Sequence, residues 1–454
     1  MKVLGAVLAA GKGERMRIAR PKPLFPMLGL PMIAYALDAL RRAGIPSPVV
    51  IASPETREPL GRVLGKGVRF VVQPRPRGTG DAVNRLRALA RGAGRLVVIN
   101  ADSPLFEPVH VRTLVARALS ARAQVAFATA VVDDPSGLGR VLRDPDGKVA
   151  NIVEDSEASP EVRRIREINA GLYAFETPAI FSLLDSVEPV GVKRELYLTR
   201  AVELALSRGL AVATAPVPAE AALGVNNLAE AALARAVLLS RKLAALMSSG
   251  VAVEDPASTH IDWEVSVGPG SVILPGTILM GRTRVGRDCV LGPHSVVTDS
   301  LLGNAVIVRS SYVTGSRMMD GSEAGPFVHV RAGCVLGRGV QLRTHAEVVR
   351  ARLGDGVKMH HFSYIGDAVV GPNVNVGAGA ITANYDGRKK WPSRIGRGAF
   401  LGSGSVLVAP ANVGERAVIA AGAVVPGRRR VPAGAVMAGV PARPLANSRG
   451  RKRV

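Results

Sequence analysis

The stretch IGRGAFLGSGSVLVAPANVGERAVIAAGAVV, residues 395 to 425, carries an aliphatic residue at every sixth position. A six-residue period with glycines between the aliphatic positions is typical of a parallel β-helix, in which three such segments make one triangular coil. The aliphatic side chains are expected to fill the interior of the coil and to take no part in chemistry. They are Ile395, Leu401, Leu407, Val413, Ile419 and Val425.

The same period begins near residue 251, and its length predicts about ten coils. A five-residue step separates Val348 from Leu353 without ending the pattern. We therefore predict a β-helix domain over residues 251–437, followed by a basic tail over 438–454. The upstream aliphatic positions are Val267, Ile273, Leu279, Val285, Leu291 and Val297, then Leu336, Leu342, Val348, Leu353, Met359 and Ile365.

Residues 1–227 alternate short apolar runs with stretches of helical spacing. Runs that are apolar throughout are typical of parallel strands covered on both faces. The pattern predicts an open, Rossmann-like, mostly parallel α/β sheet with its ligands at the carboxyl ends of the strands. Residues 228–250 are expected to form a linker helix. The expected strands are 2–10, 48–53, 68–73, 95–100 and 124–132, and the expected helices are 31–44 and 80–92.

The composition narrows the class of protein. The net charge is +23, but the basic residues are scattered and are not gathered with aromatic residues, which argues against a nucleic-acid partner. No apolar stretch reaches the length of about 20 residues that a membrane helix needs. The two cysteines cannot form a disulfide framework, so a reducing cytoplasm fits best. Anionic small molecules such as phosphates suit a basic chain.

The segment VLAAGKGERM, residues 7–16, places a glycine-rich turn directly after an apolar run. A P-loop needs the order Gly-Lys-Ser/Thr, whereas Gly13 follows Lys12 here. A dinucleotide fingerprint needs a third glycine where Met16 stands. What remains is a strand, a turn whose N–H groups can approach an anion, and basic residues, which suit a nucleoside triphosphate.

LAAGKGERM, followed by Pro21 and Lys22, resembles the signature of sugar-1-phosphate nucleotidylyltransferases. Other matching residues follow in family order, from Gln73 to Asn226. Together with the hexapeptide repeat, nearly the whole chain resembles the bifunctional N-acetylglucosamine-1-phosphate uridylyltransferase/glucosamine-1-phosphate N-acetyltransferase family. The resemblance implies that the β-helix is left-handed, that the substrates are UTP, sugar-1-phosphates and acetyl-CoA, and that the product serves peptidoglycan and other glycan synthesis.

The resemblance also implies roles in the first domain. Arg15 and Lys22 would act on the triphosphate as catalytic cations, and Asp102 and Asn226 would bind Mg²⁺. Arg200 departs from the family, which usually has an acidic residue in this segment. The nucleotide-binding residues would be Leu8, Ala9, Ala10, Gly11, Gly13, Lys22, Gln73, Gly78 and Thr79, and the sugar-binding residues would be Gly139, Glu154, Asn169 and Asn226.

GPFVHVRAG and MHHFSYIGDAVVGPNVNVGAGAITANYDG resemble the acetyltransferase half of the family. His361 would be the base that deprotonates the sugar amine, because histidine titrates near neutral pH. The resemblance implies a homotrimer with the thioester site between neighbouring β-helices. The sugar-phosphate residues would be Arg331, Tyr364, Asn375 and Lys390, and the acetyl-CoA residues would be Ala378, Asn384, Tyr385, Ser403 and Ala421.

Two departures affect this half. Val349 stands where the family carries a phosphate-binding lysine, and Gly439 stands where it carries an arginine. Arg350 or Arg352 are candidates to replace the missing lysine. Three hypotheses therefore stay open: a bifunctional enzyme, a nucleotidylyltransferase with the β-helix as a trimerising scaffold, and a nucleotide-sugar-binding regulatory subunit without activity.

Overall fold

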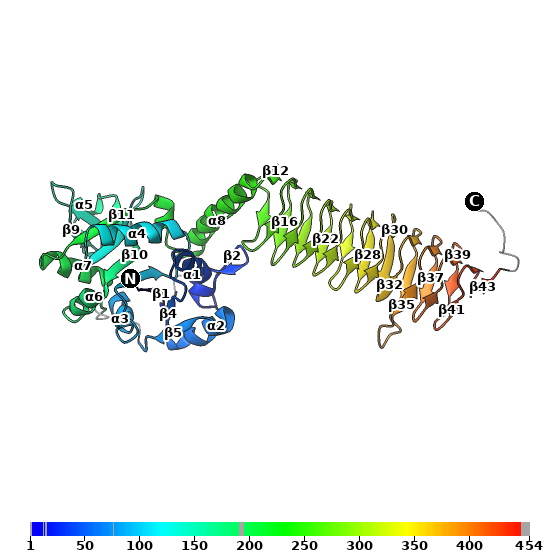
Figure 1. Cartoon of the computed structure of the whole chain (residues 1–454), viewed down its shortest axis with the longest axis horizontal. Helices are drawn as coiled ribbons and strands as arrows, with labels where there is room; N and C mark the ends of the chain where they lie inside the picture. The colour runs from blue at the N-terminus through cyan, green and yellow to red at the C-terminus, as the bar shows by residue number, and fades with distance from the viewer. Residues whose placement is uncertain (1, 12, 14–15, 76, 190–194, 446–454) are drawn as a thin grey trace. The chain divides into compact units, whose positions relative to one another are not determined.

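The computed structural model describes residues 2–11, 13, 16–75, 77–189 and 195–445, and the chain divides into two compact units (Figure 1). The units are Met1–Leu238 and Leu239–Val454. Their division falls inside the long helix α8 (Leu228–Ser248), which is the linker helix expected from the sequence. Leu243 and Leu246 of α8 belong to the core of the second unit. Domain boundaries at the two ends of this helix stay a prediction.

The first unit is built on a mixed sheet with the strand order β11-β7-β10-β6-β1-β4-β5. The expected strands are all present. β1, β4, β5 and β6 pair parallel with one another, and β7 pairs parallel with β11, which the sequence analysis did not identify. The sequence analysis did not identify β10, which runs antiparallel between β6 and β7. The strands are β1 (Val3–Ala9), β4 (Val49–Ala52), β5 (Arg69–Val72), β6 (Arg95–Asn100), β7 (Val125–Val131), β10 (Glu167–Glu176) and β11 (Val212–Pro216), with the hairpin β8 (Arg140–Arg143) and β9 (Val149–Val153) beside β10.

Helices cover both faces of this sheet, which explains why its strands are apolar throughout. Successive β1 residues face opposite cores, since Ala6 packs in one cluster and Val7 in the other. One face carries α1 (Met32–Arg42), α2 (Pro54–Leu64) and α4 (Pro108–Ser120). The other face carries α3 (Thr79–Asn84), α6 (Thr177–Leu184) and α7 (Leu198–Ser207).

The helix expected over residues 80–92 is shorter than predicted, because α3 ends at Asn84 and turns follow it. The N–H groups of Leu86 and Arg87 bond carbonyls three residues back rather than four. The Arg87 guanidinium bonds the Asn84 side chain and the Phe181 carbonyl, which holds this tighter turn against α6.

Three parallel sheets form the second unit, as in a left-handed β-helix. We call them the first, second and third faces. The first runs from β12 (Ala252–Val253) to β42 (Val436–Ala438), where β43 (Arg443–Pro444) pairs antiparallel. The second runs from β13 (His260–Ile261) to β40 (Val424–Val425), and the third from β14 (Ser266–Val267) to β41 (Arg430–Val431). Edge 1–2 carries the turns from first to second face, and edge 2–3 the turns from second to third.

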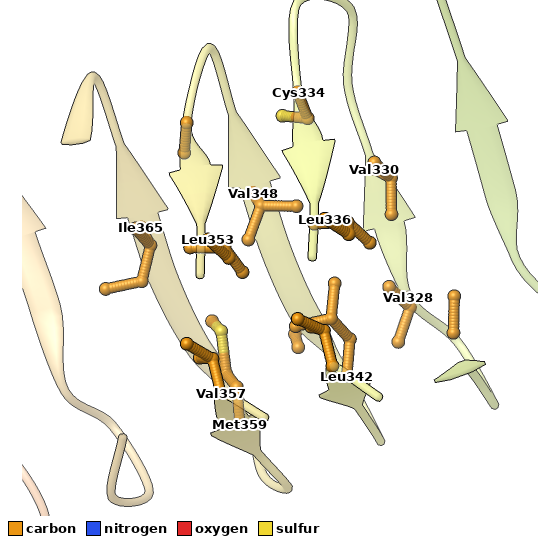
Figure 2. Close-up of a cluster of buried hydrophobic side chains, with 14 of the residues drawn as sticks. Val328, Val330, Cys334, Leu336, Leu342, Val348, Leu353, Val357, Met359 and Ile365 are labelled. Atoms are coloured by element: carbon orange, nitrogen blue, oxygen red, sulfur yellow. The ribbon is translucent and has the colours of Figure 1, made fainter. Parts of the chain in front are cut away.

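The aliphatic residues of the hexapeptide period point into the coil, as predicted. Figure 2 shows a section of this core, in which side chains of successive coils stack on one another. Small hydroxyl residues fill the corners and bond to backbone carbonyls; the Thr277 hydroxyl, for example, donates to Leu274 O at 2.7 Å. The interior therefore leaves no room for chemistry, so functional side chains must lie on the faces and edges.

Candidate active sites

A cavity of about 610 Å³ opens at the carboxyl ends of β1, β5 and β6. This is the edge at which an open α/β sheet binds its ligands, and β1 and β6 flank the point where the strand order reverses. The structure gathers there every described residue that the sequence assigned to nucleotide or metal. These are Leu8, Ala9, Ala10, Gly11, Gly13, Lys22, Gln73, Gly78, Thr79, Asp102 and Asn226. Arg15 lies outside the described residues.

Lys22 is the charged centre of the cavity. Its ammonium donates to Asp102 Oδ2 at 2.5 Å and to Asn226 Oδ1 at 3.0 Å. One carboxylate oxygen and one amide oxygen therefore converge on one cationic position, and these are donor types that Mg²⁺ also prefers. Gly13 has φ +67°, and a Cβ there would lie 2.5 Å from the Lys22 Cβ, so only glycine fits beside the lysine.

The loop from Gln73 to Thr79 is tied to the segment before α7. The buried Gln73 amide donates to Gly78 O at 3.0 Å and to Asp81 Oδ2 at 2.8 Å. Leu198 N donates to the Thr79 hydroxyl at 3.0 Å. Gly78 has φ +94°, and a Cβ there would lie 2.5 Å from Leu196 O. These contacts hold Gln73, Gly78 and Thr79 in place before any ligand binds.

The cavity also includes residues that the sequence analysis missed, notably Asn100 and Glu195. Asn100 ends β6 as the first polar residue after an apolar run, a signal that could have been read. Glu195 accepts a hydrogen bond from Tyr197, which raises the pKa of that phenol, and burial and the nearby Glu154 add to the effect. Glu195 and Tyr197 both stand in the segment ELYLTRAV, in which the sequence analysis names only Arg200.

Gly139, Glu154 and Asn169 form a second group, beside β10 and α7 rather than among the residues that line the cavity. Asn169 N donates to Gly139 O at 2.9 Å, and the Thr199 hydroxyl donates to Glu154 Oε1 at 2.7 Å. The Asn169 amide donates to the hydroxyl of Tyr173 at 2.5 Å. Burial raises the pKa of the Tyr173 phenol, so this hydroxyl stays neutral.

Arg200, the departure from the family, is held by two carboxylates. Its guanidinium lies 2.6 Å from Glu203 Oε2 and 2.6 Å from Glu157 Oε2. Burial lowers the pKa of Arg200, but the Glu203 hydrogen bond and the charges of Glu203 and Glu157 outweigh it and raise the pKa. The extra positive charge is thus neutralised locally, while Glu154 is held by Thr199.

Four of the expected acetyltransferase residues stack along edge 1–2. His361 lies in the turn between β30 (Lys358–Met359) and β31 (Ser363–Gly366). Backbone bonds join this turn to the next ones: Gly379 N to Phe362 O, Gly404 N to Ala378 O, and Gly422 N to Ser403 O. His361, Ala378, Ser403 and Ala421 therefore follow one line along the β-helix.

The two adjacent histidines differ in environment. The His360 ring lies 2.9 Å from the Gln341 side-chain oxygen, and burial, helped by the charges of Arg343 and Lys358, lowers its pKa. The His361 side chain is exposed and has no hydrogen-bond partner among the described residues. This arrangement favours His361 as the ring that is free to meet a substrate.

A polar network occupies edge 2–3. The Asn384 amide donates to Asp367 Oδ2 at 2.5 Å and to the Tyr364 hydroxyl at 3.3 Å, and Arg350 bonds both Asp367 oxygens at 2.6 and 2.8 Å. The Arg350 hydrogen bond, aided by Asn384, lowers the pKa of Asp367 despite burial. The sequence analysis had not considered Asp367, because its role depends on a residue 17 positions away.

Of the remaining expected sugar-phosphate residues, Arg331 and Lys390 lie near the second face or on edge 2–3, and Asn375 does not. Arg331 pairs with Glu347 at 3.1 Å, and Glu347 is the register neighbour of Tyr364. The backbone of Lys390 forms an isolated antiparallel β-bridge with that of Tyr385, in the loop that carries Asn384. Asn375 lies on the first face, in β33 (Asn375–Val376). Within one chain, Ala378, Ser403 and Ala421 lie on edge 1–2, but Asn384 and Tyr385 lie on edge 2–3.

The structure shows the surroundings of Val349 and Gly439, the two residues that depart from the family pattern in this half. Val349 is only 3% exposed, whereas Arg350 has φ +45° and reaches Asp367 in the edge 2–3 network. Arg352 lies instead on the third face, in β29 (Arg352–Leu353). Of the two candidates to replace the missing lysine, Arg350 therefore lies beside Tyr364 and Asn384. Gly439 has φ +88°, a backbone conformation that favours glycine.

Two properties of the described residues bear on the class of protein. No helix among them is long and apolar enough to cross a bilayer. No group of three or more His, Cys, Asp or Glu side chains among them could hold a metal. A metal at Asp102 would therefore need further ligands from substrate or water.

Comparisons with known proteins match both units. The nucleotidyl transferase family matches residues 4–216. The bacterial transferase hexapeptide family (six repeats) matches 264–299, and the hexapeptide repeat of succinyl-transferase matches 392–426.

Full-length relatives share this order of domains. A bifunctional protein GlmU from Exiguobacterium sp. is 38% identical, over 91% of this chain and 92% of its own. Its counterpart from Pelotomaculum thermopropionicum is 42% identical over 90% of each chain, and that from Heliobacterium modesticaldum is 39% identical over 91% and 90%. With a nucleotidyltransferase unit and a hexapeptide acyltransferase unit in one chain, this protein belongs to the bifunctional GlmU family.

Proposed function

We propose that the chain makes UDP-N-acetylglucosamine in two steps. The β-helix transfers an acetyl group from acetyl-CoA to glucosamine-1-phosphate, and the first unit then transfers a uridylyl group from UTP to the N-acetylated sugar phosphate. The observation that carries the proposal is the single cavity lined by all the described nucleotide and metal candidates. The full-length GlmU relatives support both halves.

In the uridylyl step, a phosphate oxygen of the sugar attacks the α-phosphorus of UTP, and the bond to the departing pyrophosphate breaks. Negative charge grows on the phosphate oxygens, so cations placed in advance stabilise the transition state. The Lys22 ammonium is such a cation, and the glycines at 11 and 13 leave N–H groups open to phosphate. Gln73 and Thr79 are proposed to read uracil, and Gly139, Glu154 and Asn169 to hold the sugar.

Mg²⁺ fits the residues present, because Asp102 Oδ2 and Asn226 Oδ1 converge on one point. These two oxygens would hold the ion, which would supply further positive charge for the phosphates. In the structure the Lys22 ammonium stands at this point and touches both oxygens. When the ion and the nucleotide bind, the ammonium would leave this point to the ion and turn to the phosphates.

In the acetyl step, the sugar amine attacks the thioester carbonyl and the thiol of CoA leaves. His361 takes the proton from the amine, and its ring suits this role because it is exposed and has no hydrogen-bond partner among the described residues. Tyr364, Asn384 and Arg350, with Arg331 and Lys390, would bind and orient the sugar phosphate. In this proposal Arg350 supplies the cation that Val349 lacks.

A trimer is part of the proposal because one chain separates the acetyl-CoA candidates onto two edges. If the second face of one copy meets edge 1–2 of the next, His361 and Asn384 of different copies form one site. The alternative, a nucleotidylyltransferase with a trimerising β-helix, is favoured by the buried Val349 at the position of the expected lysine.

Mixing two inactive variants tests the shared site. His361→Ala chains and Asn384→Ala chains are unfolded and refolded together, and thiol release from acetyl-CoA with glucosamine-1-phosphate is measured. If each site lies between two copies, about one site in four should regain activity in a random mixture. Such a site needs an intact His361 from one copy and an intact Asn384 from the next, and each copy supplies the intact residue with a chance of about one half. No recovery in a properly assembled mixture would contradict the shared site, and no thiol release by the unmodified protein would favour the scaffold alternative.

A further inference from the structure

The third face of the β-helix differs from the other two in charge. Its outward register positions alternate between arginine and uncharged residues along successive coils, and none is acidic. The equivalent positions of the first and second faces hold no arginine. The third-face arginines are Arg284, Arg317, Arg352, Arg394 and Arg430, and all are exposed.

The positive charge is greatest at the last coils. Neighbouring strands lie about 4.8 Å apart, so arginines on alternate coils are about 9.6 Å apart along the face. At the end of this row, Arg428 and Arg429 in the turn before β41 join Arg430. The Arg428 N–H donates to Pro410 O at 2.6 Å, which ties this turn to the preceding coil.

These arginines line a groove of about 410 Å³ that also includes Arg394 of β35 (Ser393–Ile395). None of the four forms an ion pair with a carboxylate in the part of the chain that the structure describes. Arg331 and Arg350 on the second face and edge 2–3, by contrast, are each paired with one. The groove therefore concentrates four positive charges that no described side chain balances.

The rest of the lining adds apolar surface and an amide to the arginines of the groove. Val369, which is 44% exposed, and the prolines 392 and 410 offer apolar surface, and Asn412 offers an amide. The volume lies within the range of small-molecule sites. Guanidinium groups bind phosphate through paired hydrogen bonds, and an apolar wall accepts a flat ring. No residue of the groove belongs to the nucleotide, sugar or acetyl-CoA candidates described above.

We propose that this groove is a separate binding site for a small nucleotide polyphosphate, with the phosphates on the arginine cluster and the base against Val369 and the prolines. The site is independent of both proposed activities. Arginine-specific labelling with phenylglyoxal, with and without ATP and read by peptide mass spectrometry, locates the bound phosphates. ATP should protect Arg394 and Arg428–Arg430, while Arg284, Arg317 and Arg352, on the same face, stay reactive. Equal labelling of the groove arginines with and without ATP would overturn the proposal.

A pair of triple variants gives a second measurement. ATP binding to the full chain is measured by equilibrium dialysis for R394Q/R428Q/R430Q and for the control R284Q/R317Q/R352Q, which removes the same charge from the same face. The groove variant should lose one ATP site per chain or bind it at least about tenfold more weakly, because charge-assisted hydrogen bonds to phosphate are lost. The control should match the unmodified protein. An equal loss in the two variants would mean that the row binds polyanions in general, and no loss in either would mean that the groove binds no nucleotide; both results contradict the proposal.

Discussion

Lys22 joins two side chains that lie 80 and 204 residues away along the sequence. The contact brings the ends of the first unit's chain to one point, where the glycine at 13 leaves room for the lysine stem. A single residue thus connects the opening motif to Asp102 and Asn226. Its charge, rather than its packing, should decide the nucleotidyl step.

Lys22→Met should therefore lower kcat/KM for pyrophosphate release by about 100- to 1000-fold, the usual cost of removing one group that stabilises transition-state charge. Lys66→Met, at an exposed position, is the matched control and should keep full activity. Thiol release should be unchanged in both variants. If Lys22→Met retained more than half of the pyrophosphate release, the lysine would have no catalytic role.

The lowered pKa of His360 predicts how the free energy of unfolding changes with pH. Burial is the first cause that lowers its pKa below 6.5, so the unfolded chain takes up this proton before the folded chain does. The contribution of neutral His360 to the free energy of unfolding is complete above pH about 6.5 and is lost as pH falls through the lowered pKa of this residue. His360→Gln should flatten this part of the curve of unfolding free energy against pH, measured by urea denaturation. Identical slopes in the unmodified protein and His360→Gln would contradict the lowered pKa of His360.

At the scale of elements, the turn before α3 depends on one glycine. Gly78 and Gly147 both have positive φ, but only at Gly78 would a Cβ meet backbone, at 2.5 Å from Leu196 O. Gly78→Ala should therefore displace the loop that carries Thr79 and raise the KM for UTP. Gly147→Ala should cost only backbone strain, on the order of 1 kcal/mol, with no change in KM. Equal effects of the two substitutions on KM would show that the close approach at Gly78 does not matter.

The β-helix gives a second test at this scale. Leu336 is fully buried in the core shown in Figure 2, whereas Leu301 on the third face is 41% exposed. Leu336→Ala should lower the free energy of unfolding by about 2–5 kcal/mol, and Leu301→Ala by less than about 0.5 kcal/mol. Denaturant unfolding followed by circular dichroism measures both. Similar costs would contradict the inward and outward register of the coil.

For the whole molecule, the sequence predicted the regular parts best. The six-residue period predicted the buried register, and the apolar runs predicted the parallel strands. β10 was not identified as a strand, and its reversed direction could not be predicted because strand direction depends on the partners, β6 and β7, and not on local pattern. Likewise, motifs located the cavity, but Glu195 and Asp367 enter their sites from loops whose partners are distant in sequence.

One chain is proposed to carry two separate transferase sites. The most direct measurement follows pyrophosphate release from UTP and N-acetylglucosamine-1-phosphate, and thiol release from acetyl-CoA and glucosamine-1-phosphate, in the same preparations of Asp102→Asn and His361→Ala. Asp102→Asn should lose pyrophosphate release and keep thiol release, and His361→Ala should do the reverse. Loss of both activities in either variant, or full retention of both, would contradict the claim.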